Sequence, residues 1–353
     1  MQKIDKNLII AMFINIRLWM LFFLRISTIL ISLLYFFRES FIAELTISFV
    51  PYIIWFCILA LIIEIYLIIH ESKRRRKHKS IKILFTILIA ILTIWIWTLY
   101  SSEFFWFYNQ NDESIRITSK NWIKTFYANI LYKNTDYESL KEKIIQENPD
   151  IVILVEFSDE HEDEMKDFFK ENYPYMNRNS RSTMLAGDVV FSKLPIEDAY
   201  TTWIEWRWNR KYSYIQIECE DSTFECKNNF DLYVIHTAAP VSVENFEMRN
   251  NQLEKLWLDF KQNNNPNPVI VIWDFNLSPR SYYYKKLIKN RNLKNALSFQ
   301  SPNYTRSLLQ QWIFRSHIDQ LFISSDIRIS PITIENLSWS DHRSFSFSIE
   351  IID

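Results

Sequence analysis

Three things are scarce in this sequence: glycine, cysteine and net charge. Only one residue in 353 is glycine, whereas an average protein contains about 7%. Three cysteines allow one disulfide at most. The formal net charge is −1, so the chain lacks the overall basic field with which a nonspecific nuclease neutralises many phosphates. No serine or cysteine has the setting of an activated nucleophile, which argues against a covalent intermediate.

Long apolar runs are present, and they lie in the first hundred residues. Residues 48–69 and 83–100 have the length that crosses a bilayer, about 20 residues. A third run, 18–37, contains Arg25, and an interfacial helix is its alternative interpretation because an arginine inside a membrane is costly. No signal-peptide cleavage pattern follows it. The runs predict an α-helical membrane region over residues 1–100 with about three transmembrane helices.

A basic segment, Lys73–Lys79, separates the second and third runs. By the positive-inside rule such a loop faces the cytoplasm. The chain after the third run then lies on the extracytoplasmic side, beyond a connector at 101–120. Cys219 and Cys226 flank a short predicted hairpin. A disulfide between them in that oxidising compartment and two free thiols are equally open.

Residues 121–353 predict one globular domain. Buried-type strands and amphipathic helices are mixed there, without the strict alternation that a parallel sheet requires. This favours two packed sheets flanked by helices. Strands are expected at 123–130, 150–157, 188–191, 212–218, 231–236 and 269–272, and helices at 136–147, 159–171 and 244–261.

Polar side chains stand where the buried strands end. Asp274 and Asn276 follow the strand that begins at Val269, and if strand geometry persists both side chains emerge on one face. Open α/β sheets place their chemistry at such an edge. Each residue alone also has a structural interpretation, as a cap or a solvated strand end. The other polar residues of this kind are Glu156, His236, Asp319, Asp341 and His342.

In this order, the segments resemble the endonuclease/exonuclease/phosphatase (DNase I-like) superfamily of metal-dependent phosphoesterases. The resemblance covers about residues 120–353, and it is greatest to the membrane-anchored bacterial branch. It implies an α+β fold, a four-layer αββα sandwich preceded by the membrane region. The matching segments are Asn129 in FYANI, Glu156 in VILVE, His236 in VIHTAAP, Asp274 and Asn276 in WDFN, Asp319 in HIDQLF, and Asp341-His342 in SDHRS, with weaker matches in GDVVFSKLP at 187–195 and in Arg249 with Gln252-Leu253.

The resemblance also implies a metal site. Asn129, Glu156 and Asp341 are the expected ligands of one Mg²⁺ or Mn²⁺. Oxygen ligands suit these hard cations and leave positions open for phosphate and water. Such an ion polarises the phosphoryl oxygen and neutralises its developing charge.

The remaining motif residues are expected to act on water and phosphate. His342 would be the general base for the attacking water, oriented by Asp319 or Asp341. Asp274 would position or help to deprotonate that water. Asn276 and His236 would donate hydrogen bonds to the phosphate oxygens in the transition state.

Tryptophan occupies positions where the family has glycine. Trp273 replaces the glycine of GDFN, and Trp339 precedes SDH. One hypothesis is that UGA codons, which the organism reads as glycine, have been translated as tryptophan. A genome that avoids GGN codons is the alternative, but it does not explain tryptophan at motif positions. If Trp273 is genuine, its indole is expected beside Asp274, where it would block the phosphate pocket.

The function expected is hydrolysis of a phosphodiester or phosphomonoester by activated water. The resemblance and the apolar runs together imply a multi-pass protein of a bacterial cell membrane with an extracytoplasmic catalytic domain. That location favours a lipid-linked phosphate as substrate. The alternatives are an extracytoplasmic nuclease acting on nucleic acid and, if Trp273 is genuine, an inactive binding domain. No obligate protein partner is indicated.

Overall fold

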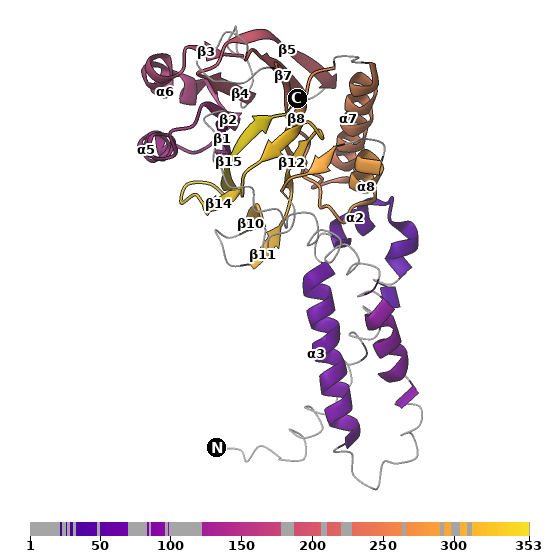
Figure 1. The fold of residues 1–353 in the computed structure, drawn as a ribbon. Coiled ribbons are helices and arrows are strands. Elements are labelled where there is room, and N and C mark those ends of the chain that lie inside the picture. Colours follow the sequence, from indigo (N-terminus) through magenta and orange to yellow (C-terminus); the bar gives the residue numbers. More distant parts are fainter. Residues whose placement is uncertain are drawn as a thin grey trace, which may run out of the picture. The chain divides into compact units, whose positions relative to one another are not determined.

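A computed structural model gives the fold (Figure 1). It describes residues 22, 26, 29–30, 33–47, 50–69, 83–84, 86–95, 98, 122–177, 187–205, 210–219, 228–262, 266–289, 293–297, 304–308 and 313–352. The chain forms two compact units, Met1–Trp106 and Phe107–Asp353.

The first unit is helical where it is described. It contains a 3₁₀ turn, η1 (Tyr35–Phe37), and two α-helices, α2 (Phe41–Ile47) and α3 (Val50–Ile69). Residues 86–95 are helical as well.

The predicted membrane topology was wrong. Crossing the hydrocarbon core of a bilayer requires a helix of about 20 predominantly apolar residues. Within the described ranges, no helix combines sufficient length with sufficient apolar character to do so. The multi-pass localisation with an extracytoplasmic catalytic domain is therefore contradicted. Lys73–Lys79, on which the predicted orientation depended, and the connector at 101–120 lie outside the described residues.

The second unit contains two β-sheets. The first has the strand order β13-β15-β1-β2-β4-β3, with β14 paired to β15. The strand β1 runs parallel to β2, and the other pairs are antiparallel. Its strands are β1 (Ile123–Asn129), β2 (Ile151–Phe157), β3 (Tyr175–Met176), β4 (Gly187–Ser192), β13 (Ile327–Ile329), β14 (Thr333–Asn336) and β15 (Arg343–Ile351).

The second sheet has the order β5-β6-β7-β8-β12-β9. Only β7 and β8 are parallel among its described pairs. A separate two-stranded ribbon is formed by β10 (Arg306–Leu308) and β11 (Ile313–Ser316). The strands of the second sheet are β5 (Ile196–Glu205), β6 (Arg210–Ile217), β7 (Phe230–His236), β8 (Val269–Asp274), β9 (Lys294–Asn295) and β12 (Asp319–Ile323).

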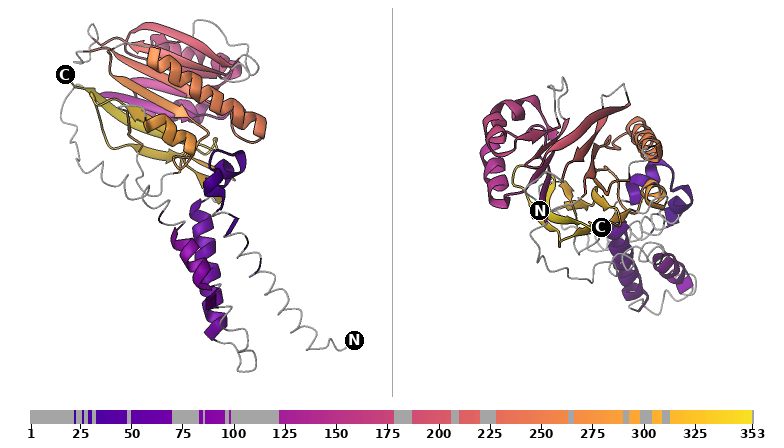
Figure 2. Two further views of the ribbon diagram at one scale, coloured as in Figure 1. Left: turned by 90° about the vertical axis from the view of Figure 1, so that its right-hand side faces the viewer. Right: turned by 45° about the horizontal axis from the view of Figure 1, so that its top comes forward.

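Helices cover the outer face of each sheet. The helices α5 (Tyr137–Glu147) and α6 (Asp159–Asn172) pack on the first sheet, and α7 (Val243–Gln262) and α8 (Tyr282–Lys289) pack on the second. Figure 1 shows the two pairs on opposite sides of the strands, and the right-hand view of Figure 2 shows the same layers from another direction. A third apolar cluster, with side chains from both sheets, fills the space between them. The predicted αββα sandwich is confirmed for this unit.

Residues other than glycine adopt the left-handed backbone conformation in this fold. In the described part of the chain, Leu131, Asn148, Glu156 and Asn276 have positive φ, and none of them is glycine. Asn148, with φ 43°, ends α5 in the position where glycine is commonest. Asparagine tolerates this conformation because its short polar side chain bonds locally. Glu156 has no such reason, and it lies in the candidate site.

Candidate active site

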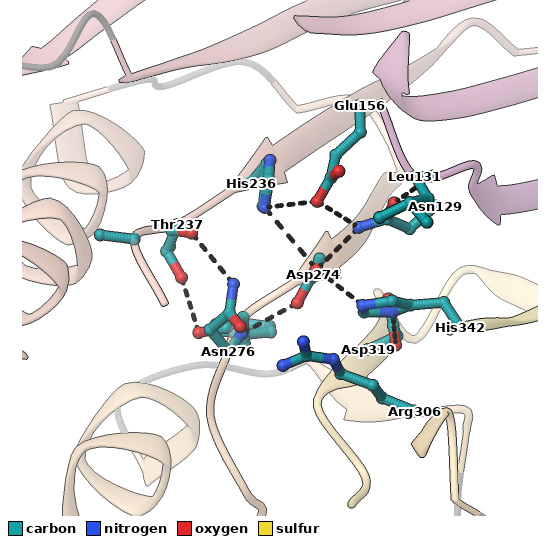
Figure 3. Close-up of polar contacts among 12 residues, drawn as sticks. Asn129, Leu131, Glu156, His236, Thr237, Asp274, Asn276, Arg306, Asp319 and His342 are labelled. Atoms are coloured by element: carbon teal, nitrogen blue, oxygen red, sulfur yellow. Dashed lines mark hydrogen bonds and ion pairs between the residues drawn. The ribbon is translucent and has the colours of Figure 1, made fainter. Parts of the chain in front are cut away.

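Strand ends from both sheets meet at one edge of the sandwich. On the second sheet β7 and β8 run parallel and place His236 opposite Asp274. The antiparallel strand β12 begins at the same edge, with Asp319 opposite Asp274. On the first sheet Asn129 ends β1, beside β2, which carries Glu156. Figure 3 shows these side chains and His342 pointing toward one another.

Asp274 lies at the centre of the group and is buried. Its Oδ1 accepts a hydrogen bond from the main-chain N of Asn276 at 3.1 Å, and its Oδ2 accepts one from Asn129 Nδ2 at 3.1 Å. The Nε2 atoms of His236 and His342 each lie 3.7 Å from Oδ2. Burial and the charge of Asp319 raise the pKa of Asp274 to about 7, so this carboxylate can exchange a proton near neutral pH.

A buried pair of Asp319 and His342 faces Asp274. Asp319 Oδ2 lies 2.9 Å from His342 Nδ1, and Asp319 Oδ1 accepts a hydrogen bond from Tyr127 OH at 2.9 Å. Burial disfavours the imidazolium, but the charges of Asp319 and Asp274 outweigh it and raise the pKa of His342 to about 9. The same burial and the charge of Asp319 raise the pKa of Tyr127 well above its ordinary value. His342 therefore carries its proton at neutral pH in the metal-free protein.

Glu156 and Asn129 form the other side of the site. Asn129 Nδ2 donates to Glu156 Oε1 at 3.1 Å, and the main-chain N of Tyr132 donates to Glu156 Oε2 at 3.0 Å. Glu156 has φ 62° and lies at an irregularity in the pairing of β2 with β4. A side chain larger than glycine is strained in this conformation, by about 1–3 kcal/mol. The strain is concentrated at the residue whose carboxylate reaches the centre of the site, 3.8 Å from His236 Nε2.

The donor set fits a divalent cation. Three carboxylates, the buried Asp274 and Asp319 and the half-buried Glu156, converge around the one imidazolium of His342, so the site keeps an excess of negative charge that a cation would offset. One ligand atom each from Asp274, Asp319 and His342 lies within 4.8 Å of the others, close enough to share an ion. Oxygen donors supplemented by imidazole suit Mn²⁺ or Mg²⁺.

The ligand set expected from the sequence is brought together only in part. Asn129 and Glu156 are in direct contact. Asp341 instead accepts a hydrogen bond from Arg306 Nε at 2.9 Å. Neighbours in sequence thus have different contacts, since His342 contacts Asp319 while Asp341 contacts Arg306.

The turn after β8 differs from the expectation that strand geometry persists through Asn276. The strand ends at Asp274, and Asn276 has φ 46°. The hydrogen bond from its main-chain N to Asp274 Oδ1 closes this turn. Its Nδ2 donates to the main-chain O of Thr237 at 3.1 Å, and Thr237 Oγ1 donates to Phe275 O at 2.6 Å. The loops that follow β7 and β8 are therefore tied to each other.

Two residues of α7 hold these loops from behind. Arg249 is fully buried, and its Nη1 donates to the main-chain O of Asn276 at 3.2 Å. Its guanidinium also lies over the rings of Phe246 and Tyr283, with centroid distances of 5.2 and 5.8 Å. Gln252 Oε1 accepts a hydrogen bond from the main-chain N of Ala238 at 2.9 Å. This is the structural role of the weak Arg249 and Gln252 match.

Trp273 does not stand in the phosphate pocket, contrary to the expectation for a genuine tryptophan. Successive side chains of a strand point to opposite faces. The indole of Trp273 therefore faces α7 and α8, where it is 1% exposed and stacks on Phe275 at a centroid distance of 3.5 Å. Its buried Nε1 has no hydrogen-bond partner among the described residues. Trp339 packs against the cluster beneath α5 and α6.

Sequence reasoning missed several residues of the site. Ser340 Oγ donates to Asn129 O at 2.8 Å and accepts from the main-chain N of His342 at 3.0 Å, which connects the ends of β1 and β15. Thr305 Oγ1 accepts from the main-chain N of Asp319 at 2.9 Å. Of the missed residues, only Ser340 had a signal, its place in the SDH segment. Cys219, two residues after the end of β6, is disulfide-bonded, and Cys226 lies outside the described residues.

Comparison with known proteins identifies the family and the fold. A model of the Endonuclease/Exonuclease/phosphatase family matches residues 126–342. No curated protein sequence matches the chain. Among solved structures, a humanised zebrafish (D. rerio) TDP2 superposes with a TM-score of 0.55 at 12% identity, covering 66% of this chain and 100% of that one.

Two further structures are similar to the same degree. The catalytic domain of human Nocturnin, with bound sulfate, has a TM-score of 0.51 at 18% identity and covers 67% of this chain and 96% of its own. A mannosyl-6-phosphatase from Bacteroides thetaiotaomicron has a TM-score of 0.51 at 14% identity, covering 64% and 99%. At these identities the likeness concerns the fold.

Proposed function

The chain belongs to the endonuclease/exonuclease/phosphatase family of phosphoric-ester hydrolases, and from this premise we propose that it hydrolyses a phosphate monoester or diester with activated water at Asp274. The observation that carries the proposal is the buried line of Asp319, His342 and Asp274, with contacts of 2.9 and 3.7 Å. Buried ionisable groups held this close are typical of sites that move protons.

We assign the general base to Asp274 in place of His342. A base must be free to accept a proton at the working pH, and its pKa is best near that pH. In the metal-free protein the pKa of Asp274, about 7, meets this condition, whereas that of His342, about 9, leaves the imidazole protonated. Asp274 then takes a proton from water as the oxygen of that water bonds to phosphorus and the ester P–O bond breaks. The imidazolium of His342, held by Asp319, stabilises the negative charge that develops on the phosphate.

Glu156 and Asn129 are the residues that we propose to hold Mg²⁺ or Mn²⁺, and Asn129 Nδ2 also contacts the carboxylate of Asp274, the proposed base. When bound, the cation supplies charge neutralisation at the phosphoryl oxygens. Glu156 suits this role because both of its oxygens are oriented by hydrogen bonds from Asn129 Nδ2 and Tyr132 N. The expected third ligand, Asp341, is left out because of its bond to Arg306.

His236 and Asn276 remain the proposed donors to the phosphate oxygens. One hydrogen of Asn276 Nδ2 is used by the carbonyl of Thr237, and an amide carries two, so the second is available. The backbone turn at φ 46° fixes the direction of that amide. His236 Nε2 lies 3.7 Å from Asp274 Oδ2, within reach of a ligand between them.

The proposal does not extend to a lipid-linked phosphate, because that expectation depended on the predicted membrane location. It also does not extend to the inactive binding domain, because the indole of Trp273 lies on the opposite face of β8 from Asp274. Nocturnin, TDP2 and the mannosyl-6-phosphatase share the fold at 12–18% identity, and their names do not single out one substrate.

The test is hydrolysis of small aryl phosphate monoesters and diesters by the full chain with Mg²⁺, with Mn²⁺ and with a chelator. We expect metal-dependent turnover that Asp274→Asn and Glu156→Ala each abolish. Asp326→Asn is the matched control, because this carboxylate is exposed on a turn and contacts Ser325. Turnover that survives Asp274→Asn would overturn the assigned base. Cleavage confined to DNA, and steeply weakened by salt, would instead identify a nuclease.

A further inference from the structure

Arg306 is fixed beside the site by its main chain. It begins β10 and forms an antiparallel bridge with His342. The main-chain N of Ser307 donates to Asp341 O at 3.0 Å, and the main-chain N of Arg343 donates to Thr305 O at 2.7 Å. The start of β10 thus runs alongside the segment that carries Asp341 and His342, so Arg306 cannot move away without breaking these bonds.

The side chain of Arg306 is held at one edge only. Its Nε donates to Asp341 Oδ2 at 2.9 Å. Neither Nη atom has a hydrogen-bond partner within the described part of the chain, and the side chain is 33% exposed. In Figure 3 the guanidinium extends toward Asp274 and Asn276. Burial disfavours its charge, but Asp341, Asp274 and Asp319 together raise the pKa of Arg306, so the charge is permanent.

A guanidinium anchored through Nε presents two parallel Nη donors, the geometry that matches two oxygens of a phosphate. An arginine that served only to pair with Asp341 would have no need to direct its other edge at a cluster of catalytic groups. We propose that Arg306 binds two non-bridging oxygens of the substrate phosphate and that Asp341 positions its guanidinium to do so. The inference rests on the proposed function for the identity of the site and deepens it by naming the residue that recognises the anion.

This inference also explains Asp341. Its carboxylate lies next to His342 in sequence but contacts Arg306, so it acts on the substrate through that arginine. Arg328 provides a comparison within the same domain. It pairs with Glu350 at 3.3 Å on the edge strand β13 and is 52% exposed, far along the sheet from the strand ends of the site.

Binding of inorganic phosphate to the full chain, measured by calorimetry in the presence of Mg²⁺, tests the inference without requiring turnover. We expect Arg306→Ala to weaken binding about 10- to 100-fold, the effect of losing charge-assisted hydrogen bonds. Arg306→Lys keeps the charge but lacks the two parallel Nη donors, so its phosphate affinity should lie between that of the unchanged protein and that of Arg306→Ala. Asp341→Asn should also weaken binding, by less than Arg306→Ala. Arg328→Ala should bind as the unchanged protein does.

Hydrolysis of an aryl monoester and an aryl diester separates this inference from the proposed function. Both esters have at least two non-bridging phosphate oxygens, to which Arg306 is proposed to bind. KM for both should therefore rise about tenfold in Arg306→Ala. If the unchanged protein hydrolyses neither ester but its phosphate binding depends on Arg306, the function fails and the anion site stands. If turnover occurs and Arg306→Ala matches Arg328→Ala in binding and KM, the inference about Arg306 is overturned. An effect confined to the monoester overturns it equally. If Arg306→Ala has a clearly lower melting temperature than the unchanged protein, the phosphate affinity and KM of Arg306→Lys and Asp341→Asn are used to test the inference.

Discussion

His342 Nδ1 lies 2.9 Å from Asp319 Oδ2, and both side chains are buried. Since Asp319 occupies the first position of β12 and His342 the position directly before β15, this contact joins the two sheets at the active edge. It leaves the other imidazole nitrogen directed at Asp274, 3.7 Å away. The orientation and the charge of the imidazole therefore both depend on Asp319.

Replacement of Asp319 by asparagine should lower the pKa of His342 from about 9. The amide has the shape of the carboxylate but no charge, so burial then acts on the imidazolium with less opposition. Activity should fall about a hundredfold or more, the usual contribution of a positioned group that stabilises transition-state charge. NMR titration of the His342 ring protons in the metal-free protein measures the pKa. An unchanged titration would show that Asp319 does not control the imidazole.

The stability of the metal-free protein should fall as the pH rises. The folded-state pKa of Asp274 is raised from 3.8 to about 7, and that of His342 from 6.5 to about 9. In both cases the folded state holds its proton more tightly, so the stability is present below the unfolded pKa and is lost as the pH rises through the folded one. Urea unfolding from pH 4 to 9 measures this. In Asp274→Asn the decline between pH 4 and 7 should be smaller, and an equal decline would contradict the prediction.

Divalent metal should stabilise the protein more at pH 8 than at pH 5. The carboxylate of Asp274 lies beside the proposed ligand Asn129; it is largely ionised at pH 8, where its charge attracts the cation, and largely protonated at pH 5. We expect Mn²⁺ or Mg²⁺ to raise the melting temperature at pH 8, and a chelator to reverse the effect. Glu156→Ala should abolish it. A metal-induced shift that is the same at both pH values would mean that the ion binds elsewhere.

Arg249→Met should lower kcat about tenfold with a small change in melting temperature. Methionine has a similar length and is apolar, and such replacements of a buried charge are often neutral for stability. The lost hydrogen bond to Asn276 O releases the turn that carries a phosphate donor, and small misplacements of such groups are costly. Steady-state kinetics and thermal melting are compared for Arg249→Met and Arg249→Lys. If kcat is unchanged in Arg249→Met, Arg249 does not position Asn276.

Trp273→Gly should leave kcat nearly unchanged in the molecules that fold, because the indole lies on the far face of β8 from Asp274. Its removal opens a cavity beneath α7 and α8 and should cost about 3–5 kcal/mol of stability. The unpaired Nε1, which is removed with it, offsets a part of this. Kinetics on the folded fraction and urea unfolding provide the two measurements. A large rise in kcat would show that the indole obstructs the site after all.

Whether residue 273 is tryptophan in the cell is a separate question that the gene answers. The recoding hypothesis expects UGA at codons 273 and 339, at the positions where the family has glycine. UGG at both positions would refute it. The structure itself adds one relevant observation: the buried indole N–H of Trp273 has no partner within the described ranges, and unpaired groups of this kind are rare in native proteins.

Much of the second unit could be predicted from local sequence. The strand at Ile151–Phe157 and the helix α5 appear within about two residues of their predicted bounds. The reason is that a continuous apolar run or a helical period is a property of neighbouring residues. The order of the polar residues at the strand ends was equally readable and led to the correct family and the αββα architecture.

The membrane prediction was wrong because it counted apolar residues along the chain. What decides whether a segment crosses a bilayer is one helix that has the length and the apolar character together, and no described helix has both. The expectation for Asn276 failed for a related reason. Two residues share a face only while strand geometry lasts, and the chain turns left-handed at Asn276.

The sequence by itself determined the fold class, the family and most of the groups that meet at the active edge. Buried strands and the polar residues at their ends can be recognised from residues that are neighbours in the chain. The tertiary structure alone decided which of these groups touch. In the folded chain His342 contacts Asp319, 23 positions away, and Asp341 accepts a hydrogen bond from Arg306. The indole of Trp273 packs on the face of β8 opposite to Asp274. Contacts between residues far apart in the chain depend on strand register and on the packing of two sheets, and neither is encoded in the neighbours of a single residue.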